Sequence, residues 1–369
     1  MLITIDQSSF LSALQTAQRG SSSQSTLPIL AGIKMETQKD GFLILHGTDL
    51  ELSIKVKCPA SVEREGATVV PGKLIVDIVK FMPQGAVNIE SVEGKNDIEI
   101  KSAKASFKLK GMAPEDFPTF PTVEEKRKVT IDAKQLIEMI KCTIRAISRD
   151  ETRPVLTGAM LKVENKSLLM VATDSYRLAI KTMSVRSKKL DDISLLIPYQ
   201  AIEETQKLLA EERGKIEITS DDNLMRIGSG EKELVARLIE GQYPDYKQLI
   251  PKEAKTGAEV VKEELIDAIK RVSLMAQKNM SIKISIEDEG IRVQAATQGI
   301  GEASELVKVK AKGENISEMA FNAQFLVDGL QGMSGDKARV EFTGSVNPGL
   351  IKSTSKEDYL YLLMPIRIS

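Results

Sequence analysis

Two short runs of the chain share an alternation of apolar and polar residues around a Thr-Asp pair. Residues 47–54 read GTDLELSI, and residues 172–180 read ATDSYRLAI. Such alternation predicts half-buried β-strands. The aspartates of the two pairs stand 125 residues apart. The pattern therefore indicates an internal repeat, which has priority over local assignments.

The same order of predicted elements recurs around both runs. In the first copy, a strand at 3–5 and a helix that continues to residue 19 precede strands and a second helix, at 27–37, 42–46, 50–56 and 72–82. The second copy gives a strand, a helix, three strands and a second helix, at 129–131, 133–147, 155–163, 168–172, 176–182 and 198–209. A fainter third copy shows helical spacing at 262–277 and 323–333.

We therefore predict an α+β fold of three tandem domains, each with two helices packed on antiparallel sheet. A chain of 369 residues suits two or three domains. The predicted boundaries are 1–123, 124–248 and 249–369.

Composition narrows the classes of protein. No apolar run has membrane-spanning length, the start lacks the pattern of a secretory signal, and Cys58 and Cys142 make no disulfide framework, so we expect a cytoplasmic protein with no membrane partner. Basic and acidic side chains number 51 and 52, and aromatic residues are 4%. This balance argues against a protein that coats nucleic acid through its whole surface or stacks single-stranded bases.

Enzymatic chemistry has little support. Asp49 and Asp174 recur in both copies, and we interpret them as turn-capping residues, with a catalytic role for Asp174 as the alternative. His46, the single histidine, sits in a strand pattern as a packed or surface residue. The sequence has no phosphate-binding loop, nucleophile elbow or zinc-ligand spacing. We expect neither catalytic residues, nor a metal, nor a cofactor.

One charge pattern has two interpretations. Lys134, Lys141, Arg145 and Arg149 have the spacing of one face of a helix. Such a stripe is commonly a solvated face. The alternative is a mildly positive surface that faces phosphates.

The copies differ after the Thr-Asp pair. The second copy continues with Ser175, Tyr176, Arg177 and Leu178, where the first has LELS. The chain also ends on an apolar strand at 359–364, which should pack against something because termini otherwise fray.

The whole chain resembles the bacterial DNA sliding clamp family, the beta subunits of DNA polymerase III. The resemblance rests on LPIL (27–30), GTDLE (47–51), FKLKGMAPEDFP (107–118), TRPVLTG (152–158), VATDSYRLA (171–179), EGQYPDY (240–246) and MPIR (364–367). It implies a head-to-tail homodimeric ring with helices lining the hole, which encircles double-stranded DNA without sequence specificity. It also implies a processivity factor that binds the replicative polymerase alpha subunit, the clamp loader, and repair and translesion proteins through short linear peptides.

The resemblance also implies three sets of site residues. The peptide-binding pocket would comprise Leu156, Thr173, Ser175, Tyr176, Arg177, Leu178, Pro244, Gln248, Leu249, Val346, Leu362 and Met364, with Pro365 and Ile366 at its edge. The DNA-facing residues would be Gln24, Lys73, Lys80, Lys141, Arg145, Arg149 and Lys270. The ring seam would join Phe107 and Leu109 to Leu274 and Met275, although these four also suit an ordinary core.

Two competing hypotheses remain open at this point. A monomeric scaffold could bind DNA or peptides without forming a ring, and a monomeric native mass would favour it. An enzyme would need a metal- or cofactor-dependent activity on nucleotides that is lost on substitution of Asp174.

Overall fold

The computed structural model describes residues 1–22, 25–92, 94–164, 166–184, 193–276, 280–344, 346–354 and 358–366. Its contacts divide the chain into two compact units. The first unit contains Met1–Ala133 and Glu203–Leu238, and the second contains Lys134–Ile202 and Ile239–Ser369. Each unit thus holds part of the second sequence copy. Among the described residues, no helix combines the length and the apolar composition of a membrane span.

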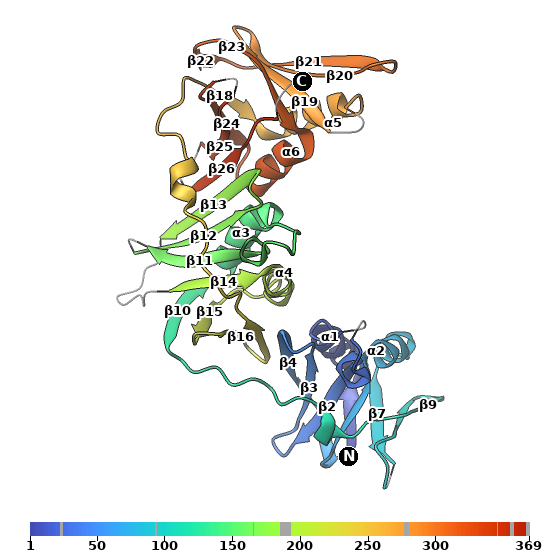
Figure 1. Ribbon diagram of the computed structural model, residues 1–369. Coiled ribbons are helices and arrows are strands. Elements are labelled where there is room, and N and C mark those ends of the chain that lie inside the picture. Colours follow the sequence, from blue (N-terminus) through green and yellow to red (C-terminus); the bar gives the residue numbers. More distant parts are fainter. Residues whose placement is uncertain are drawn as a thin grey trace. The chain divides into compact units, whose positions relative to one another are not determined.

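Two sheets form the first unit (Figure 1). The eight-stranded sheet has the order β10 (Arg127–Asp132), β15 (Lys215–Ser220), β16 (Leu224–Ser229), β17 (Lys232–Arg237), β4 (Leu52–Pro59), β3 (Phe42–Thr48), β2 (Gly32–Gln38), β6 (Ala67–Pro71). The five-stranded sheet has the order β5 (Ser61–Arg64), β1 (Leu2–Asp6), β7 (Ala86–Ser91), β8 (Ile98–Ser102), β9 (Ala105–Leu109). Every pairing in both sheets is antiparallel.

Helices α1 (Gln7–Gln18) and α2 (Gly72–Phe81) pack on these sheets and on each other. Asp6 caps α1, because its carboxylate accepts the backbone N–H of Ser9. Phe10, Leu14 and Ala17 are fully buried at the spacing of one helical face. The predicted strand–helix start of the first copy is therefore confirmed.

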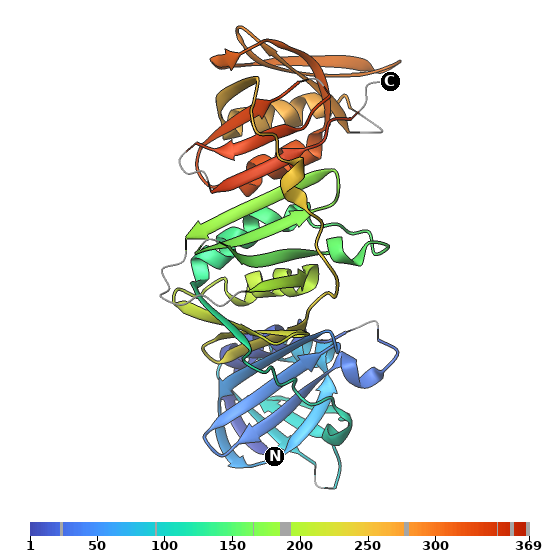
Figure 2. The ribbon, with the colours of Figure 1, turned by 60° about the vertical axis from the view of Figure 1, so that its left-hand side comes forward.

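The second unit also has two antiparallel sheets (Figures 1 and 2). The nine-stranded sheet has the order β14 (Ser194–Pro198), β11 (Gly158–Glu164), β12 (Ser167–Thr173), β13 (Arg177–Ser184), β26 (Tyr359–Leu363), β25 (Gly349–Ser353), β24 (Lys337–Phe342), β18 (Thr256–Val261), β22 (Ala311–Gly313). The four-stranded sheet has the order β21 (Gly301–Lys308), β20 (Gly290–Thr297), β19 (Ser281–Glu287), β23 (Ile316–Asn322). The helices are α3 (Ala133–Thr143), α5 (Lys262–Ser273) and α6 (Ala323–Gly332), with α4 (Tyr199–Leu208) beginning in this unit and continuing into the first.

Two joints of the same kind link successive copies. In the first unit, β4 of copy one pairs with β17 of copy two, with Leu52 opposite Ala236. In the second unit, β13 of copy two pairs with β26 of copy three, with Arg177 opposite Leu363. Each joint therefore pairs the strand after the turn at Thr48 or Thr173, here called the Thr turn, with the last strand of the next copy. Figure 2 shows the green strand of copy two beside the red strands of copy three.

Several predicted boundaries were wrong. The predicted helix 133–147 ends at Thr143 and continues as the 3-10 turn η3 (Ile144–Ala146). The predicted helix 262–277 ends at Ser273. Two predicted strands begin as 3-10 turns, η1 (Pro28–Ala31) and η4 (Pro154–Leu156), because a proline at the first position of such a turn has the φ that the turn requires.

The Thr turn occurs in all three copies, although the sequence predicted it only in two. Leu50, Ser175 and Gly299 each stand two residues after a threonine, and their φ angles are 80°, 78° and 79°. The third turn reads Thr297-Gln298-Gly299, without the aspartate. Alternation of apolar residues alone could not reveal a turn whose repeated feature is a backbone angle.

Candidate functional site

The turn after Thr173 is held by its own side chains. Asp174 Oδ1 accepts the backbone N–H groups of Tyr176 and Arg177, both at 2.9 Å. Thr173 Oγ1 donates to the carbonyl of Arg177 at 2.7 Å. In copy one, Asp49 Oδ1 accepts the N–H groups of Glu51 and Leu52 at 3.0 and 2.7 Å. The turn-capping prediction is therefore confirmed for both aspartates.

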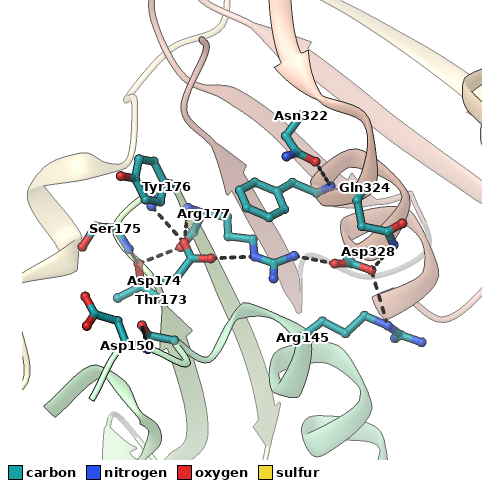
Figure 3. Close-up of polar contacts among 12 residues, drawn as sticks. Arg145, Asp150, Thr173, Asp174, Ser175, Tyr176, Arg177, Asn322, Gln324 and Asp328 are labelled. Carbon is teal, nitrogen blue, oxygen red and sulfur yellow. Dashed lines mark hydrogen bonds and ion pairs between the residues drawn. The ribbon is translucent and has the colours of Figure 1, made fainter. Parts of the chain in front are cut away.

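Arg177 gives the second copy a contact that the first lacks, because Leu52 takes its place there. Its Nε lies 2.9 Å from Asp174 Oδ2, and its Nη1 lies 2.5 Å from Asp328 Oδ2 on α6 (Figure 3). The guanidinium also lies 4.1 Å above the centre of the Phe325 ring. Arg177 thus connects the turn of copy two to a helix of copy three.

Asp328, which lies on α6, has two further side-chain partners. Its Oδ1 accepts the side-chain amide of Gln324 at 2.9 Å and lies 3.7 Å from Nε of Arg145 (Figure 3). Burial alone would lower the pKa of Arg177, but the neighbouring Tyr361, Asp328 and Asp174 outweigh it and raise that pKa. Arg177 therefore stays charged between its two carboxylates at any pH at which the protein is folded.

An apolar cluster lies under the turn. Leu178, Leu362 and Tyr246 are buried in one hydrophobic cluster that also includes Leu350. Four large apolar side chains of the same unit remain exposed, with exposed fractions of 63% at Tyr176, 48% at Leu249, 81% at Val346 and 40% at Met364. The backbone N–H of Met364 donates to the carbonyl of Tyr176 at 2.9 Å, so two of these side chains leave adjacent strand ends. We call Tyr176, Leu249, Val346 and Met364 the joint surface.

The other predicted pocket residues lie in the same unit with different surroundings. Leu156 is buried in η4, and Ser175 accepts a hydrogen bond from Arg153. Pro244 is exposed, and Gln248 lies in η5 (Tyr246–Leu249), where its amide donates to Asp245. After the half-exposed Pro365, the N–H of Ile366 donates to Ala320 of β23, so the chain leads to the four-stranded sheet.

The predicted DNA-facing residues are exposed on helices or near their ends. Lys73 and Lys80 lie on α2, Lys141 on α3 and Lys270 on α5. The predicted stripe on one helical face was wrong for Arg145 and Arg149, because α3 ends before both. Arg149 instead stacks 3.3 Å from the centre of the Tyr199 ring. Gln24 lies outside the described residues.

The four predicted seam residues divide by exposure. Phe107 on the edge strand β9 is 39% exposed, and Leu274 after α5 is 76% exposed. Leu109 is buried, and Met275 is half-buried. The sequence reasoning missed other exposed apolar residues, Leu74 and Phe81 on α2 and Ile300 in the third Thr turn.

Two cavities among the described residues are not lined by the joint surface. One of about 700 Å³ is bordered by β18, β22 and β24, and one of about 450 Å³ lies beside His46. Neither is lined by a residue of the predicted pocket. Within the described residues, no group of three or more His, Cys, Asp and Glu side chains could hold a metal ion.

Asp328 is the main site residue that sequence reasoning missed. It stands at the same place in the second helix of its copy as Glu204 does in α4 and Asp77 does in α2. A residue-by-residue comparison of the three second helices would have shown this recurring acid. No sequence signal indicated that Arg177 would meet it, because the two residues are 151 positions apart.

Three family models together match nearly the whole chain. They describe the N-terminal, central and C-terminal domains of the DNA polymerase III beta subunit, and match residues 1–121, 130–245 and 247–367. The chain belongs to the DNA polymerase III beta subunit family. As a beta sliding clamp it is the processivity factor of DNA polymerase III, a non-catalytic subunit that serves DNA replication.

Relatives and a solved structure agree with this family. The beta sliding clamp of Bacillus subtilis is 31% identical over 379 residues and covers 100% of both chains. That of Staphylococcus aureus is 32% identical over 381 residues, with 100% of this chain and 99% of the relative covered. A crystal structure of the DNA polymerase sliding clamp from Bacillus subtilis superimposes with a TM-score of 0.95, 31% identity and full coverage of both chains.

Proposed function

We propose that two copies of this chain form a head-to-tail ring that encircles double-stranded DNA, slides along it and tethers the replicative polymerase. The observation that carries the proposal is the repetition of the joint. The strand after the Thr turn pairs with the last strand of the next copy twice within the chain. The corresponding strand of copy three is β21, and the last strand of copy one is β9. Both stand at the edge of a sheet.

A second copy would supply the missing partner for both edges. If β21 of one chain pairs with β9 of another, two chains contain six similar domains and six similar joints. Head-to-tail contacts close into a ring when the rotations at these six joints add up to one full turn. Exposed sheet edges otherwise invite uncontrolled association, which closure into a ring prevents.

Side chains beside the two edges complement each other in charge and polarity. Lys104 and Lys108 are exposed in the β8–β9 hairpin, and Glu302 is exposed on β21. Phe107 and Phe81 are exposed in copy one, and Leu274 and Ile300 in copy three. We therefore add Phe81 and Ile300 to the proposed seam, and assign Leu109 and Met275 a supporting role below it.

The proposed DNA contacts are weak, as a sliding ring requires. Lys73, Lys80, Lys141, Arg145, Arg149 and Lys270 supply exposed positive charge in a chain whose net charge is −1. Phosphate contacts carry no sequence information and weaken steeply with salt. A ring that is held by enclosure needs no tight contact, so it can slide.

The joint surface is the proposed docking place for short peptides of the polymerase, the clamp loader and repair proteins. Its exposed Tyr176 and Met364 each stand two residues from a buried leucine of the apolar cluster, Leu178 and Leu362, and its exposed Leu249 precedes Ile250, which packs against that cluster. An extended or helical peptide that offers two or three apolar side chains would cover this surface. Methionine and leucine side chains suit several such partners because they adapt their rotamers.

Retention on DNA tests the ring. Protein loaded by a clamp loader onto a closed circular plasmid should remain bound during gel filtration, and should dissociate after one restriction cut. Enclosure predicts this difference, because only a free end lets the ring slip off. Equal retention on circular and linear DNA would contradict encirclement.

A further inference from the structure

At the joint between copies two and three, the guanidinium of Arg177 contacts Asp174, Asp328 and Tyr361. We infer that Asp328 is a positioning residue for the joint surface. Arg177 then acts as a strut, by which we mean a side chain that fixes two strand ends in place, and not as a charge presented to the peptide. The inference rests on the proposed peptide docking. It gives α6, a helix with no residue in the predicted pocket, a role in positioning the joint surface.

The contacts of Arg177 leave its guanidinium little freedom. Its two carboxylate partners, Asp174 and Asp328, lie on opposite sides (Figure 3). Its Nη1 also donates to Tyr361 Oη at 3.3 Å. The side chains of Arg177, Asp174 and Asp328 are only 10%, 14% and 12% exposed. A partly buried pair with several hydrogen bonds holds its geometry far better than a surface ion pair.

The strut holds the two strand ends from which Tyr176 and Met364 of the joint surface project. Arg177 is the first residue of β13 and pairs with Leu363 of β26. Tyr176 precedes it, and Tyr176 accepts the backbone N–H of Met364. A displacement of Arg177 would therefore move Tyr176 and Met364, two exposed side chains of the joint surface, together.

Comparison with the first joint shows that strand pairing does not need this strut. There Leu52 replaces Arg177, yet β4 and β17 pair in the same manner. The acid at the position of Asp328 is Glu204, which lies 2.8 Å from Lys207 of its own helix and 3.9 Å from Arg19. The contact between Arg177 and Asp328 is thus specific to the joint between copies two and three, where the joint surface lies.

Peptide affinity tests the inference. The probe is a fluorescent peptide copied from the clamp-binding segment of the replicative polymerase, titrated with the full-length protein. We expect Asp328→Asn to raise the Kd about tenfold, which corresponds to about 1.4 kcal/mol. Asp328→Glu should recover part of the affinity, because it restores the carboxylate. Glu204→Gln is the matched control at the same helical position, and it should leave the Kd unchanged.

A double-mutant cycle tests whether Arg177 and Asp328 act as one unit. If Arg177 and Asp328 act as one unit, Arg177→Met and Asp328→Asn together should weaken binding no more than the stronger single change. Affinity that is unchanged or increased in Asp328→Asn would overturn the inference, because release of Arg177 would then favour the peptide. An equal loss in Glu204→Gln would also overturn it.

The unmodified protein separates this inference from the proposed function. If wild type fails to bind the peptide, the proposed docking is wrong, and the inference fails with it. If wild type binds and Asp328→Asn binds equally well, only the inference fails. Native mass of each variant confirms that it has the assembly state of the wild type before titration.

Discussion

At the scale of single residues, His46 shows how burial decides chemistry. It lies on β3 with 5% of its surface exposed, and its Nε2 has no hydrogen-bond partner in the described part of the chain. The rings of Phe117 and Phe120 pack against it in T-shaped geometry, each with its centroid 5.0 Å away. Burial, followed by the charges of Lys34 and Lys55, lowers the pKa of His46 to about 4. The imidazole is therefore a packed neutral group, in agreement with the sequence interpretation.

This pKa predicts an acid-dependent loss of stability. The folded protein binds the proton less readily than the unfolded chain, whose histidine has a pKa of 6.5, so the free energy of unfolding should fall as pH drops from 6.5 toward 4. The total loss from this group should be about 3 kcal/mol. Urea unfolding at a series of pH values measures it.

His46→Val is the control for that titration, because Val171 occupies the corresponding position of copy two. The variant should lack the part of the pH slope that His46 contributes. Since the chain has one histidine, its imidazole signals in NMR are unambiguous. A pKa near 6.5 in the folded protein would contradict the prediction.

At the scale of elements, the Thr turn imposes the same backbone angle on three different residues. Gly299 adopts it freely, whereas Leu50 and Ser175 are L-residues with φ near 80°. The left-handed region costs an ordinary side chain about 1 kcal/mol or more. Backbone N–H groups of the turn donate to the threonine and aspartate side chains in copies one and two, and these hydrogen bonds offset the cost.

Leu50→Gly should therefore stabilise the protein. Leu50 is 55% exposed, so the change removes little packing, and relief of strain should outweigh the entropy of glycine by about 0.5 kcal/mol. Leu27→Gly is the matched control, because Leu27 is 53% exposed but has a φ of −97°. Thermal unfolding should show a higher Tm for Leu50→Gly and a lower Tm for Leu27→Gly. A fall in both would show that strain is not what distinguishes them.

At the scale of the whole molecule, the proposed seam can be compared with the two internal joints. Arg19 and Arg145 stand at the same distance from the start of the first helix of their copies, and each lies near an acid of the next copy's second helix. Leu274 holds that place in copy three, and Asp77 holds the acid's place in copy one. The seam would therefore use apolar contact where the internal joints use an ion pair.

Two substitutions of Leu274 test this arrangement. Leu274→Asp should raise the dimer dissociation constant more than a hundredfold, by about 3 kcal/mol, because it buries a carboxylate near Asp77 of the second copy. Leu274→Arg should weaken the dimer less, because it restores the ion pair of the internal joints. Sedimentation at several concentrations measures both constants. If Leu274→Arg disrupts the dimer as strongly as Leu274→Asp, the positional correspondence is wrong.

Residue order alone accounts for the features that repeat or alternate. The period, the three-domain α+β class and the Thr-Asp turns follow from residue order, because strand alternation and capping are local properties. The helix ends near Thr143 and Ser273 did not follow, since the last turn of a helix depends on what it packs against.

The way in which the copies are joined depends on contacts between distant parts of the chain. Antiparallel pairing of β13 with β26 links residues far apart in the chain, and no local pattern records which strands will meet. The same pairing brings Arg177 to Asp328 and places Tyr176 beside Met364. Residues 175–178 differ from the first copy, and this difference located the candidate site in the sequence. Their partners Asp328 and Met364 belong to copy three, so these contacts form only when the chain folds.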